Sequence, residues 1–229
     1  PAPFGEGRPG WHIEDTAITE KYFGPQYDLH GGGQDLIFPH HEAEITQQES
    51  ASGLQPFVKY WMHVAFLINK DKKMSKSAGN FDIVHDLLEK YSPEALRFYL
   101  LSAHYRSPLD YSPDLLKQST AGVRRIKEFI NKLNAINAET GIDLDNILKS
   151  AKTKFEAAMD DDFNISSAFA AIFELINQVN PLLANNKLGK SDSGKIIEFF
   201  EVINKTLGII PEREDDIPEN IIELVEKRE

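Results

Sequence analysis

The sequence contains no cysteine among its 229 residues. This absence excludes disulfide bonds, cysteine nucleophiles and any metal site built from thiolates of this chain. The sequence also lacks an apolar run long enough to cross a bilayer, and its first residues lack the basic and apolar regions of a signal peptide. We therefore expect a protein of the reducing cytoplasm that has no membrane partner.

Positive charge is also scarce, because 25 lysines and arginines stand against 36 aspartates and glutamates, which gives a formal net charge of −11 at pH 7. Such a chain is not drawn non-specifically to phosphate backbones or anionic lipids, so any contact with nucleic acid must be local. With 41% hydrophobic and 27% charged residues, the composition is that of a folded globular protein with one large domain or two smaller ones.

The apolar pattern predicts an α/β part followed by an all-helical part. Glycine and proline are frequent in residues 1–35, which is typical of a loop-rich segment with short strands. The elements predicted for the α/β part are a strand at Tyr27–His30, a turn at Gly31–Gly33, a helix over 39–52, a buried strand at Val58–Ile68 and a polar, lysine-rich loop at Asn69–Asn80.

From residue 82 onward, apolar residues recur with the helical period. The predicted helices follow the cap-like Ser92-Pro93-Glu94 and then occupy about 113–135, 143–159, 165–180, 191–207 and, weakly, 218–228. The long helices combine an apolar stripe with a polar face, which is the pattern of a small antiparallel bundle. We predict three domains, at residues 1–81, 82–112 and 113–229.

His40 and Glu44 stand four residues apart at a predicted helix start, so an imidazole and a carboxylate share one face and are able to ligate a divalent metal. Two ligands do not complete a metal site. The zinc-protease pattern His-Glu-x-x-His is absent, because the position that needs its second histidine holds Ile45. An ordinary surface ion pair is the alternative interpretation.

The glycines Gly31–Gly33 would allow a backbone to approach a ligand closely, but a turn between a strand and a helix explains them equally well. Neither a dinucleotide-binding Gly-x-Gly-x-x-Gly nor a phosphate-binding Gly-Lys-Ser/Thr loop is present. The segment Lys73–Ser77 combines two ammonium groups and two hydroxyls, which suits neutralisation of a polyphosphate. Lysine-rich loops are also common as solvated surface.

A series of strings resembles, in order and spacing, the cysteinyl-tRNA synthetases, a family of class I aminoacyl-tRNA synthetases. The strings are Arg8–Glu14 (Arg-Pro-Gly-Trp-His-Ile-Glu), Asp28–Gly33, Asp35–Glu42, Tyr60–His63, Lys73–Ser77, Pro93–Arg97, His104–Leu109 and Met159–Asn164. The resemblance covers nearly the whole chain and weakens after residue 185. It implies the second half of a Rossmann-like class I catalytic domain in residues 1–81, a stem-contacting connection in 82–112 and a helical bundle of the tRNA-binding type in 113–229.

The activity that the resemblance implies is an ATP-dependent ligase, which activates cysteine as cysteinyl-adenylate and transfers it to tRNA(Cys), with ATP and Mg2+ as substrate and Zn2+ as bound metal. The family's first half, with its His-x-Gly-His signature, and its anticodon-reading segment have no counterpart in this sequence. The resemblance therefore implies a C-terminal fragment that does not catalyse alone.

The resemblance also assigns roles to the lysine-rich loop. It implies that Lys76 contacts ATP and that Lys73 stabilises the pyrophosphate side of the transition state, with Met74, Ser75 and Ser77 in the same ATP-binding loop. Fixed cations at developing phosphate charge lower a barrier that water would screen, which agrees with these roles.

The resemblance identifies His40 and Glu44 as two of the four ligands of a zinc ion that binds the substrate thiolate. Family members commonly place a third ligand, a cysteine, after Trp-His-Ile-Glu, whereas this sequence has Asp15 there. A carboxylate is a harder ligand than a thiolate, so we expect zinc binding by this chain to be weak or absent.

Further roles follow for a substrate pocket and for RNA. Trp11, His30 and Asp35 match positions that line the cysteine pocket, and their alternative interpretations are a core aromatic, a strand-end hydrogen bond and a helix cap. The predicted helix 113–135 is a candidate for tRNA contact. Its basic residues are Lys117, Arg124, Arg125, Lys127 and Lys132.

Two other functions stay open at this point. One is a cysteine ligase that acts on an amino-sugar thiol precursor without tRNA. The other is a non-catalytic fragment that binds RNA or a protein partner through its helices. The string Met159–Asn164 in the helical part favours the synthetase by resemblance.

Overall fold

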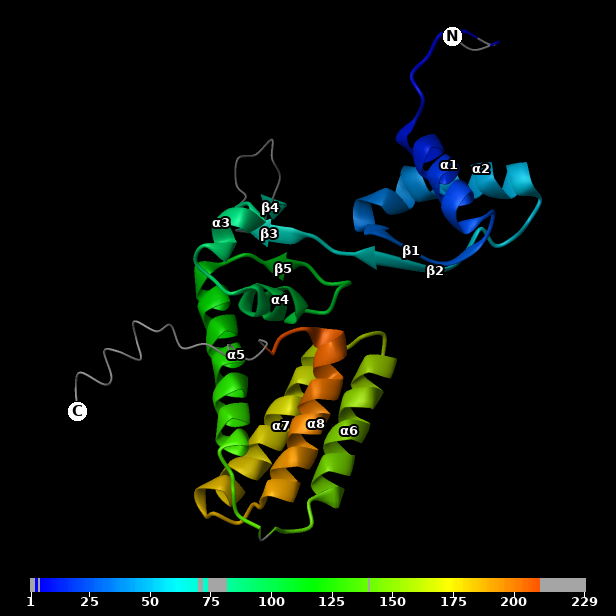
Figure 1. The fold of residues 1–229 in the computed structure, drawn as a ribbon. Coiled ribbons are helices and arrows are strands. Elements are labelled where there is room, and N and C mark those ends of the chain that lie inside the picture. Colours follow the sequence, from blue (N-terminus) through cyan, green and yellow to red (C-terminus); the bar gives the residue numbers. More distant parts are fainter. Residues whose placement is uncertain (1–2, 4, 70–71, 74–81, 140, 211–229) are drawn as a thin grey trace, which may run out of the picture. The chain divides into compact units, whose positions relative to one another are not determined.

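The computed structural model describes residues 3, 5–69, 72–73, 82–139 and 141–210, and the chain divides into two compact units (Figure 1). The first unit contains Pro1–Gly79 and Tyr105–Asp110, and the second contains Asn80–His104 and Tyr111–Glu229. The short segment Tyr105–Asp110 thus returns to the first unit from within the sequence of the second. None of the described helices is both long and apolar enough to span a membrane.

The first unit is built around two parallel strands and the helices near them. Its elements are α1 (Trp11–Phe23), β1 (Tyr27–Gly33), the 3-10 turn η1 (Gln34–Leu36), the kinked turn η2 (Ile37–His41), α2 (Glu42–Ser52) and β2 (Val58–Val64). Strands β1 and β2 pair in parallel, with Gly32 opposite His63. Because the ends of parallel strands cannot be joined by a tight turn, η1, η2 and α2 form the crossover between them.

Three short strands complete the described part of this unit, namely β3 (Leu67–Asn69), β4 (Lys72–Lys73) and β5 (Leu109–Asp110). Strand β3 lies in the centre, antiparallel to β4 and parallel to β5. The predicted strand Val58–Ile68 is therefore interrupted at Ala65 and Phe66. The Ala65 N–H donates to the Tyr105 carbonyl at 2.8 Å, and the Phe66 carbonyl accepts from the Leu109 N–H at 3.0 Å.

The helix α1 corrects the prediction of a loop-rich start. Gly10 and Gly24 flank this helix, but its apolar residues form no stripe, so periodicity does not reveal it. The predicted turn at Gly31–Gly33 was also wrong, because these glycines are the last residues of β1. A Cβ at Gly32 would lie 2.6 Å from Cε1 of His41, so this glycine gives room to a neighbouring ring.

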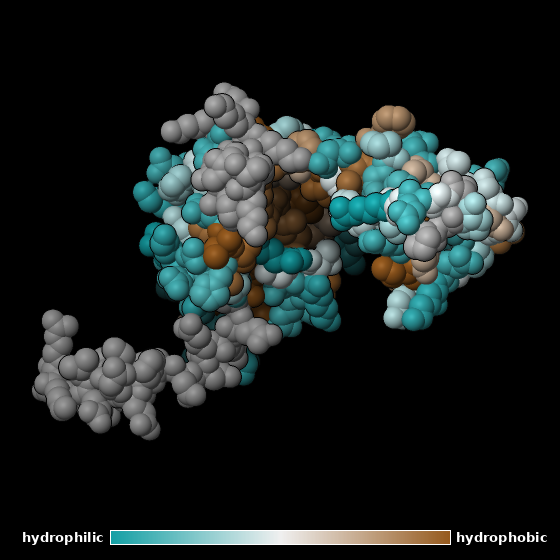
Figure 2. All heavy atoms as spheres, turned by 90° about the horizontal axis from the view of Figure 1, so that it is seen from above, coloured by the Kyte–Doolittle hydropathy of each residue, from teal (hydrophilic) through white to brown (hydrophobic). Residues whose placement is uncertain are grey.

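The expected burial of the second strand was wrong too. Val58 is buried, but Tyr60 in the same strand is 70% exposed. Within the described part of the chain β2 has only β1 as a neighbouring strand, which leaves much of its surface open. Trp11 and Phe38 of the same unit are also exposed, and Figure 2 shows hydrophobic patches among the hydrophilic surface.

The second unit is helical, as the period predicted. Its elements are α3 (Val84–Leu88), α4 (Pro93–Leu101), α5 (Pro113–Asn134), α6 (Asp145–Asp160), α7 (Ile165–Ala184) and α8 (Lys190–Leu207). The Ser92 and Ser112 hydroxyls accept the backbone N–H groups of Ala95 and Leu115, so both helices with proline at the first turn are capped. The weak helix predicted at 218–228 lies outside the described residues.

The core of this unit lies between the four long helices, which pack side by side (Figure 1). Helix α7 contributes the largest share, because most of its residues are apolar and eight of them are buried. The largest side chains of this core with almost no exposed surface are Ile126, Leu133, Leu144, Ile172, Leu175, Ile176, Ile196, Phe200, Leu207 and Ile209.

We expect Ile176→Ala to lower the free energy of unfolding of the helical unit by about 2–5 kcal/mol, because Ile176 is 0% exposed and its removal leaves a cavity. Val202→Ala is the matched control, since Val202 on α8 is 55% exposed and should change stability by less than about 0.5 kcal/mol. Urea unfolding followed by circular dichroism measures both. Equal stability losses for the two variants would contradict this placement of the core.

Candidate functional site

Ionisable side chains from four elements of the first unit meet in one place. Asp15 comes from α1, His30 from β1, and His40, His41 and Glu44 from η2 and the first turn of α2. We call these five residues the histidine–carboxylate cluster. His40, His41 and Glu44 are buried, and the Glu44 side chain is 0% exposed.

One half of the cluster contains the three predicted metal ligands. His40 Nε2 lies 2.9 Å from Glu44 Oε1, as expected for residues four apart on a helix, and 3.0 Å from Asp15 Oδ2. The ligand atoms of Asp15, His40 and Glu44 all lie within 4.8 Å of one another. The structure therefore brings Asp15 to the predicted pair, although 25 residues separate it from His40 in sequence.

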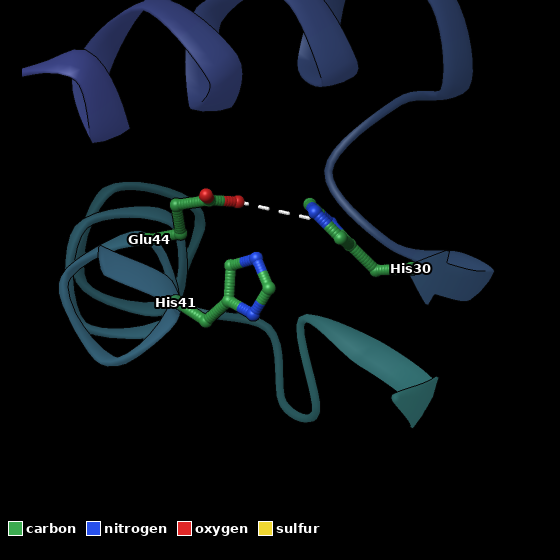
Figure 3. Close-up of side chains that lie close together, drawn as sticks. All are labelled: His30, His41 and Glu44. Carbon is green, nitrogen blue, oxygen red and sulfur yellow. Dashed lines mark ion pairs between the residues drawn. The ribbon is translucent and has the colours of Figure 1, made fainter. Parts of the chain in front are cut away.

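The other half of the cluster contains His30, His41 and Glu44, whose ligand atoms also lie within 4.8 Å of one another (Figure 3). The second carboxylate oxygen of Glu44, Oε2, lies 3.7 Å from His30 Nδ1. His41 Nδ1 shares a hydrogen bond of 2.8 Å with Nε2 of His63 on β2. The two halves thus share the Glu44 carboxylate.

Sequence reasoning gave no role to His41 and His63. Both occur in strings that carry the family resemblance, at His40-His41 and at Tyr60–His63, so a signal for them was present. His63 reaches the cluster because β1 and β2 pair with Gly32 opposite His63. A strand register of this kind is not readable from the two segments alone.

Burial is the main influence on proton binding in the cluster. It raises the pKa of Glu44 to about 7 because the charged carboxylate is desolvated, and nearby His40 only partly offsets this. It lowers the pKa of His41 to about 4, with the neighbouring imidazoles adding to the effect. The pKa values of His30 and His63 are lowered for the same first reason. These rings are therefore neutral near pH 7 and able to ligate a metal.

The cluster fits a divalent cation. Neither carboxylate oxygen of Glu44 has a hydrogen-bond partner among the described residues, and the same is true of the buried Gln48 amide one turn further along α2. A buried carboxylate without hydrogen bonds is costly, and a bound cation would offset that cost. Imidazole and carboxylate are both zinc ligands in proteins.

Two of the three predicted pocket residues, Trp11 and His30, lie at the cluster. Trp11 is 60% exposed and packs against His40, with ring centroids 4.7 Å apart. His30 belongs to the cluster itself and stacks on Trp61 at 4.7 Å. Asp35 lies in η1, next to the end of β1. Their role in binding an amino acid stays a prediction.

The predicted ATP-binding loop is only partly described. Lys73 lies in β4, opposite Ile68 of β3. Met74, Ser75, Lys76 and Ser77 lie outside the described residues. The roles assigned to this loop stay predictions.

The basic residues of α5 partly engage neighbours within the helical unit. Lys117 lies 3.4 Å from Asp114 and Arg124 lies 3.7 Å from Glu128. The Arg125 guanidinium packs over the Phe173 ring at 5.1 Å. Contact between this helix and RNA stays a prediction.

Comparison with known proteins places these residues in context. Residues 1–121 match the family model of the tRNA synthetases class I (C) catalytic domain, and residues 154–210 match the DALR domain. A cysteine–tRNA ligase of Desulforudis audaxviator is 44% identical over 225 residues, which are 94% of this chain and 47% of that protein. A cysteine–tRNA ligase of Bacillus cytotoxicus is 41% identical over 233 residues, covering 99% of this chain and 50% of that protein.

The chain therefore spans about half the length of the curated relatives it matches. A solved structure that resembles it is the ternary complex of Agrobacterium radiobacter K84 agnB2 LeuRS with tRNA and LeuAMS. The TM-score is 0.64 over 80% of this chain and 26% of that chain, with 16% sequence identity. At this identity the likeness shows a shared fold alone.

We expect Glu44→Gln to change the pH dependence of stability in the presence of a chelator. The folded pKa of about 7 lies above the ordinary value of 4.5, so ionised Glu44 destabilises the fold above pH 7 and has no such effect below pH 4.5. Between pH 5 and pH 8, the stability of the unsubstituted chain should therefore fall by about 3 kcal/mol relative to the variant.

The difference between the two proteins is the quantity to measure by urea unfolding at each pH. The pKa of His41 is lowered to about 4, so His41 lowers the stability of the folded chain as the pH falls below 6.5. This effect opposes that of Glu44. It is present in both proteins and therefore cancels in the difference between their stabilities. A difference that stays constant from pH 5 to pH 8 would show that burial does not disfavour the Glu44 anion.

Proposed function

The chain belongs to the family of tRNA synthetases class I (C), and from this premise we propose that it is part of an ATP-dependent ligase that joins cysteine to tRNA(Cys). The observation that carries the proposal is the convergence of three separate family-like strings on one buried cluster. Asp15 follows the first string, His30 belongs to the second, and His40 belongs to the third, just before Glu44. Folding alone does not require two carboxylates and three imidazoles at one point.

We also propose that the chain is the C-terminal portion of that enzyme. Its relatives are about twice as long, while 94–99% of this chain aligns with them. Two parallel strands joined through α2 form a βαβ unit, which supports the second half of a Rossmann-like catalytic domain in the first unit. The helices α5–α8 then belong to an antiparallel bundle of the tRNA-binding type.

The proposed reaction has two steps. A carboxylate oxygen of cysteine attacks the α-phosphorus of ATP, giving cysteinyl-adenylate and pyrophosphate. A ribose hydroxyl at the 3′ end of the tRNA then attacks the carbonyl carbon of the adenylate, and AMP leaves. Lys73 and Lys76 neutralise charge that develops on the pyrophosphate, while Met74, Ser75 and Ser77 shape the loop around ATP and Mg2+.

The first half of the cluster gives the proposed amino-acid specificity. Asp15, His40 and Glu44 would hold zinc, which supplies a Lewis-acid site for the cysteine thiolate, a better ligand than the hydroxyl of serine. Helix α2 fixes Glu44 and η2 fixes His40, so the two ligands face each other before any ion arrives. Trp11, His30 and Asp35 form the surrounding pocket wall.

The two other functions receive no support from the comparisons. The relatives that match the chain are named cysteine–tRNA ligase, not ligases of an amino-sugar thiol precursor. A non-catalytic RNA-binding or partner-binding fragment does not explain the buried cluster. The proposed partners are therefore tRNA(Cys), cysteine and ATP.

We expect Lys76→Ala to lower cysteine-dependent ATP–pyrophosphate exchange by about a hundredfold or more, in the enzyme with its complete catalytic domain, because one fixed cation at the phosphate charge is lost. Lys205→Ala, which removes the same charge from the exposed last turn of α8, is the matched control and should leave exchange unchanged. Exchange within twofold of the parent enzyme in the Lys76 variant would argue against the role of the loop.

We expect Asp15→Cys to raise the affinity for zinc by about tenfold or more, because a thiolate is a softer and stronger zinc ligand than a carboxylate. Competition with a chromogenic chelator measures the affinity, and elemental analysis gives the zinc content. Asp28→Cys is the control, since Asp28 is exposed in β1 and pairs with Lys59 outside the cluster. Equal zinc affinity for Asp15→Cys and the unsubstituted chain would refute Asp15 as a ligand position.

A further inference from the structure

The two oxygens of the buried Glu44 carboxylate face different partners. Oε1 lies 2.9 Å from His40 Nε2, and Oε2 lies 3.7 Å from His30 Nδ1. Neither oxygen accepts a hydrogen bond from the described residues. Because a buried carboxylate needs compensation, each oxygen is available to a positively charged ligand.

Oε2 belongs to a set of three donor residues. His30 from β1, His41 from η2 and Glu44 from α2 point toward one another, as Figure 3 shows, and their ligand atoms lie within 4.8 Å of one another. In a tetrahedral zinc site with bonds of about 2.1 Å, neighbouring donor atoms are about 3.4 Å apart. Side-chain rotations of about 1 Å at the donor atoms therefore suffice to close the set around an ion.

The His41 ring is already held in the way that metal-bound histidines are held. The Nδ1 atom of His41 is hydrogen-bonded to His63 Nε2 at 2.8 Å, which leaves His41 Nε2 for a ligand. The Trp61 ring packs on both imidazoles, with centroid distances of 4.7 Å to His30 and 4.8 Å to His41. These contacts restrict the orientations of both rings before an ion arrives.

We propose that His30, His41 and Glu44 form a second divalent-cation position, which competes with Asp15, His40 and Glu44 for the shared carboxylate. Only one ion binds at a time, because a second dication in this buried cluster would carry uncompensated charge. The inference concerns this 229-residue chain, which holds three of the four zinc ligands that the family resemblance implies, whereas the zinc site of the proposed function belongs to the complete enzyme.

The two positions differ in the class of metal they favour. Two imidazoles and one carboxylate are the donor set of many zinc sites and suit borderline ions such as Zn2+ and Co2+. Two carboxylates and one imidazole are harder and suit Mn2+. In a chain with Asp15 in place of a thiolate, Co2+ therefore goes to His30, His41 and Glu44, and Mn2+ goes to Asp15, His40 and Glu44.

One neighbour competes with the ion. The Tyr27 hydroxyl lies in hydrogen-bond contact with His30 Nδ1, and burial raises the pKa of Tyr27 to about 12, so this hydroxyl stays protonated. A cation that binds His30 Nδ1 has to displace it. Tyr27→Phe should therefore tighten Co2+ binding.

The test is a crossed titration of the 229-residue chain, with Co2+ followed by visible absorption and Mn2+ by electron paramagnetic resonance. We expect His41→Gln to weaken Co2+ binding by about tenfold or more and to leave Mn2+ binding within about threefold. Asp15→Asn should do the reverse, and Glu44→Gln should weaken both. His85→Gln, at an exposed histidine on α3, is the control and should change neither.

A loss of Co2+ binding in Asp15→Asn with none in His41→Gln would overturn the proposal, because the ion would then sit only with Asp15 and His40. Simultaneous binding of one Co2+ and one Mn2+ to the same chain would contradict the proposed competition. Circular dichroism checks folding of each variant. If His41→Gln does not fold, Tyr27→Phe decides, since Co2+ binding that is unchanged or weaker in this variant contradicts the second position.

Discussion

The arrangement of the first unit depends on compensating one buried negative charge. Glu44 lies in the first turn of α2 with no exposed surface, and its carboxylate accepts no hydrogen bond from the described residues. What surrounds it instead is imidazole, brought by β1 and η2, together with the carboxylate of Asp15 from α1. Folding of these elements around such a group costs free energy unless a proton or a metal ion neutralises it. Helix α2, strand β1 and the kinked turn η2 therefore surround the Glu44 carboxylate with groups that can hold a neutralising ion.

This dependence gives the Asp15 position its importance. A thiolate at position 15 would make the ligand set on that side of Glu44 soft, whereas the carboxylate of Asp15 makes this ligand set hard. The cluster then has two sides of different chemical character that share one ligand. Under the proposed competition, the ion that binds is decided by the side of Glu44 whose ligands it prefers.

The sequence predicted the helical unit well because its helices carry strong local signals. The period of 3.6 residues and the serine caps before Pro93 and Pro113 located α4 and α5, and α6 to α8 followed with small shifts at their ends. The first unit was harder to predict. Helix α1 has no apolar stripe, and the glycines assigned to a turn belong to β1, because pairing with β2 determines their conformation.

For the site, the pair His40 and Glu44 was predictable because residues four apart share a helix face. The approach of Asp15 rested on family resemblance, since no local pattern relates α1 to α2. His41 and His63 were not assigned, although both lie in strings that carry the resemblance, because their meeting depends on the register of β1 against β2. Local spacing thus identifies ligands on one helix, and tertiary packing decides which residues from other elements join them.

Gly32 has no side chain, and this relates it to His41, which is nine residues away in the sequence. The space a methyl group would take is filled by the edge of the His41 imidazole, with Cε1 at 2.6 Å from where that methyl carbon would stand. Any larger residue at position 32 must displace this ring. Homologous proteins with a histidine at position 41 should therefore have glycine at position 32, and those with a larger residue at position 32 should lack the histidine.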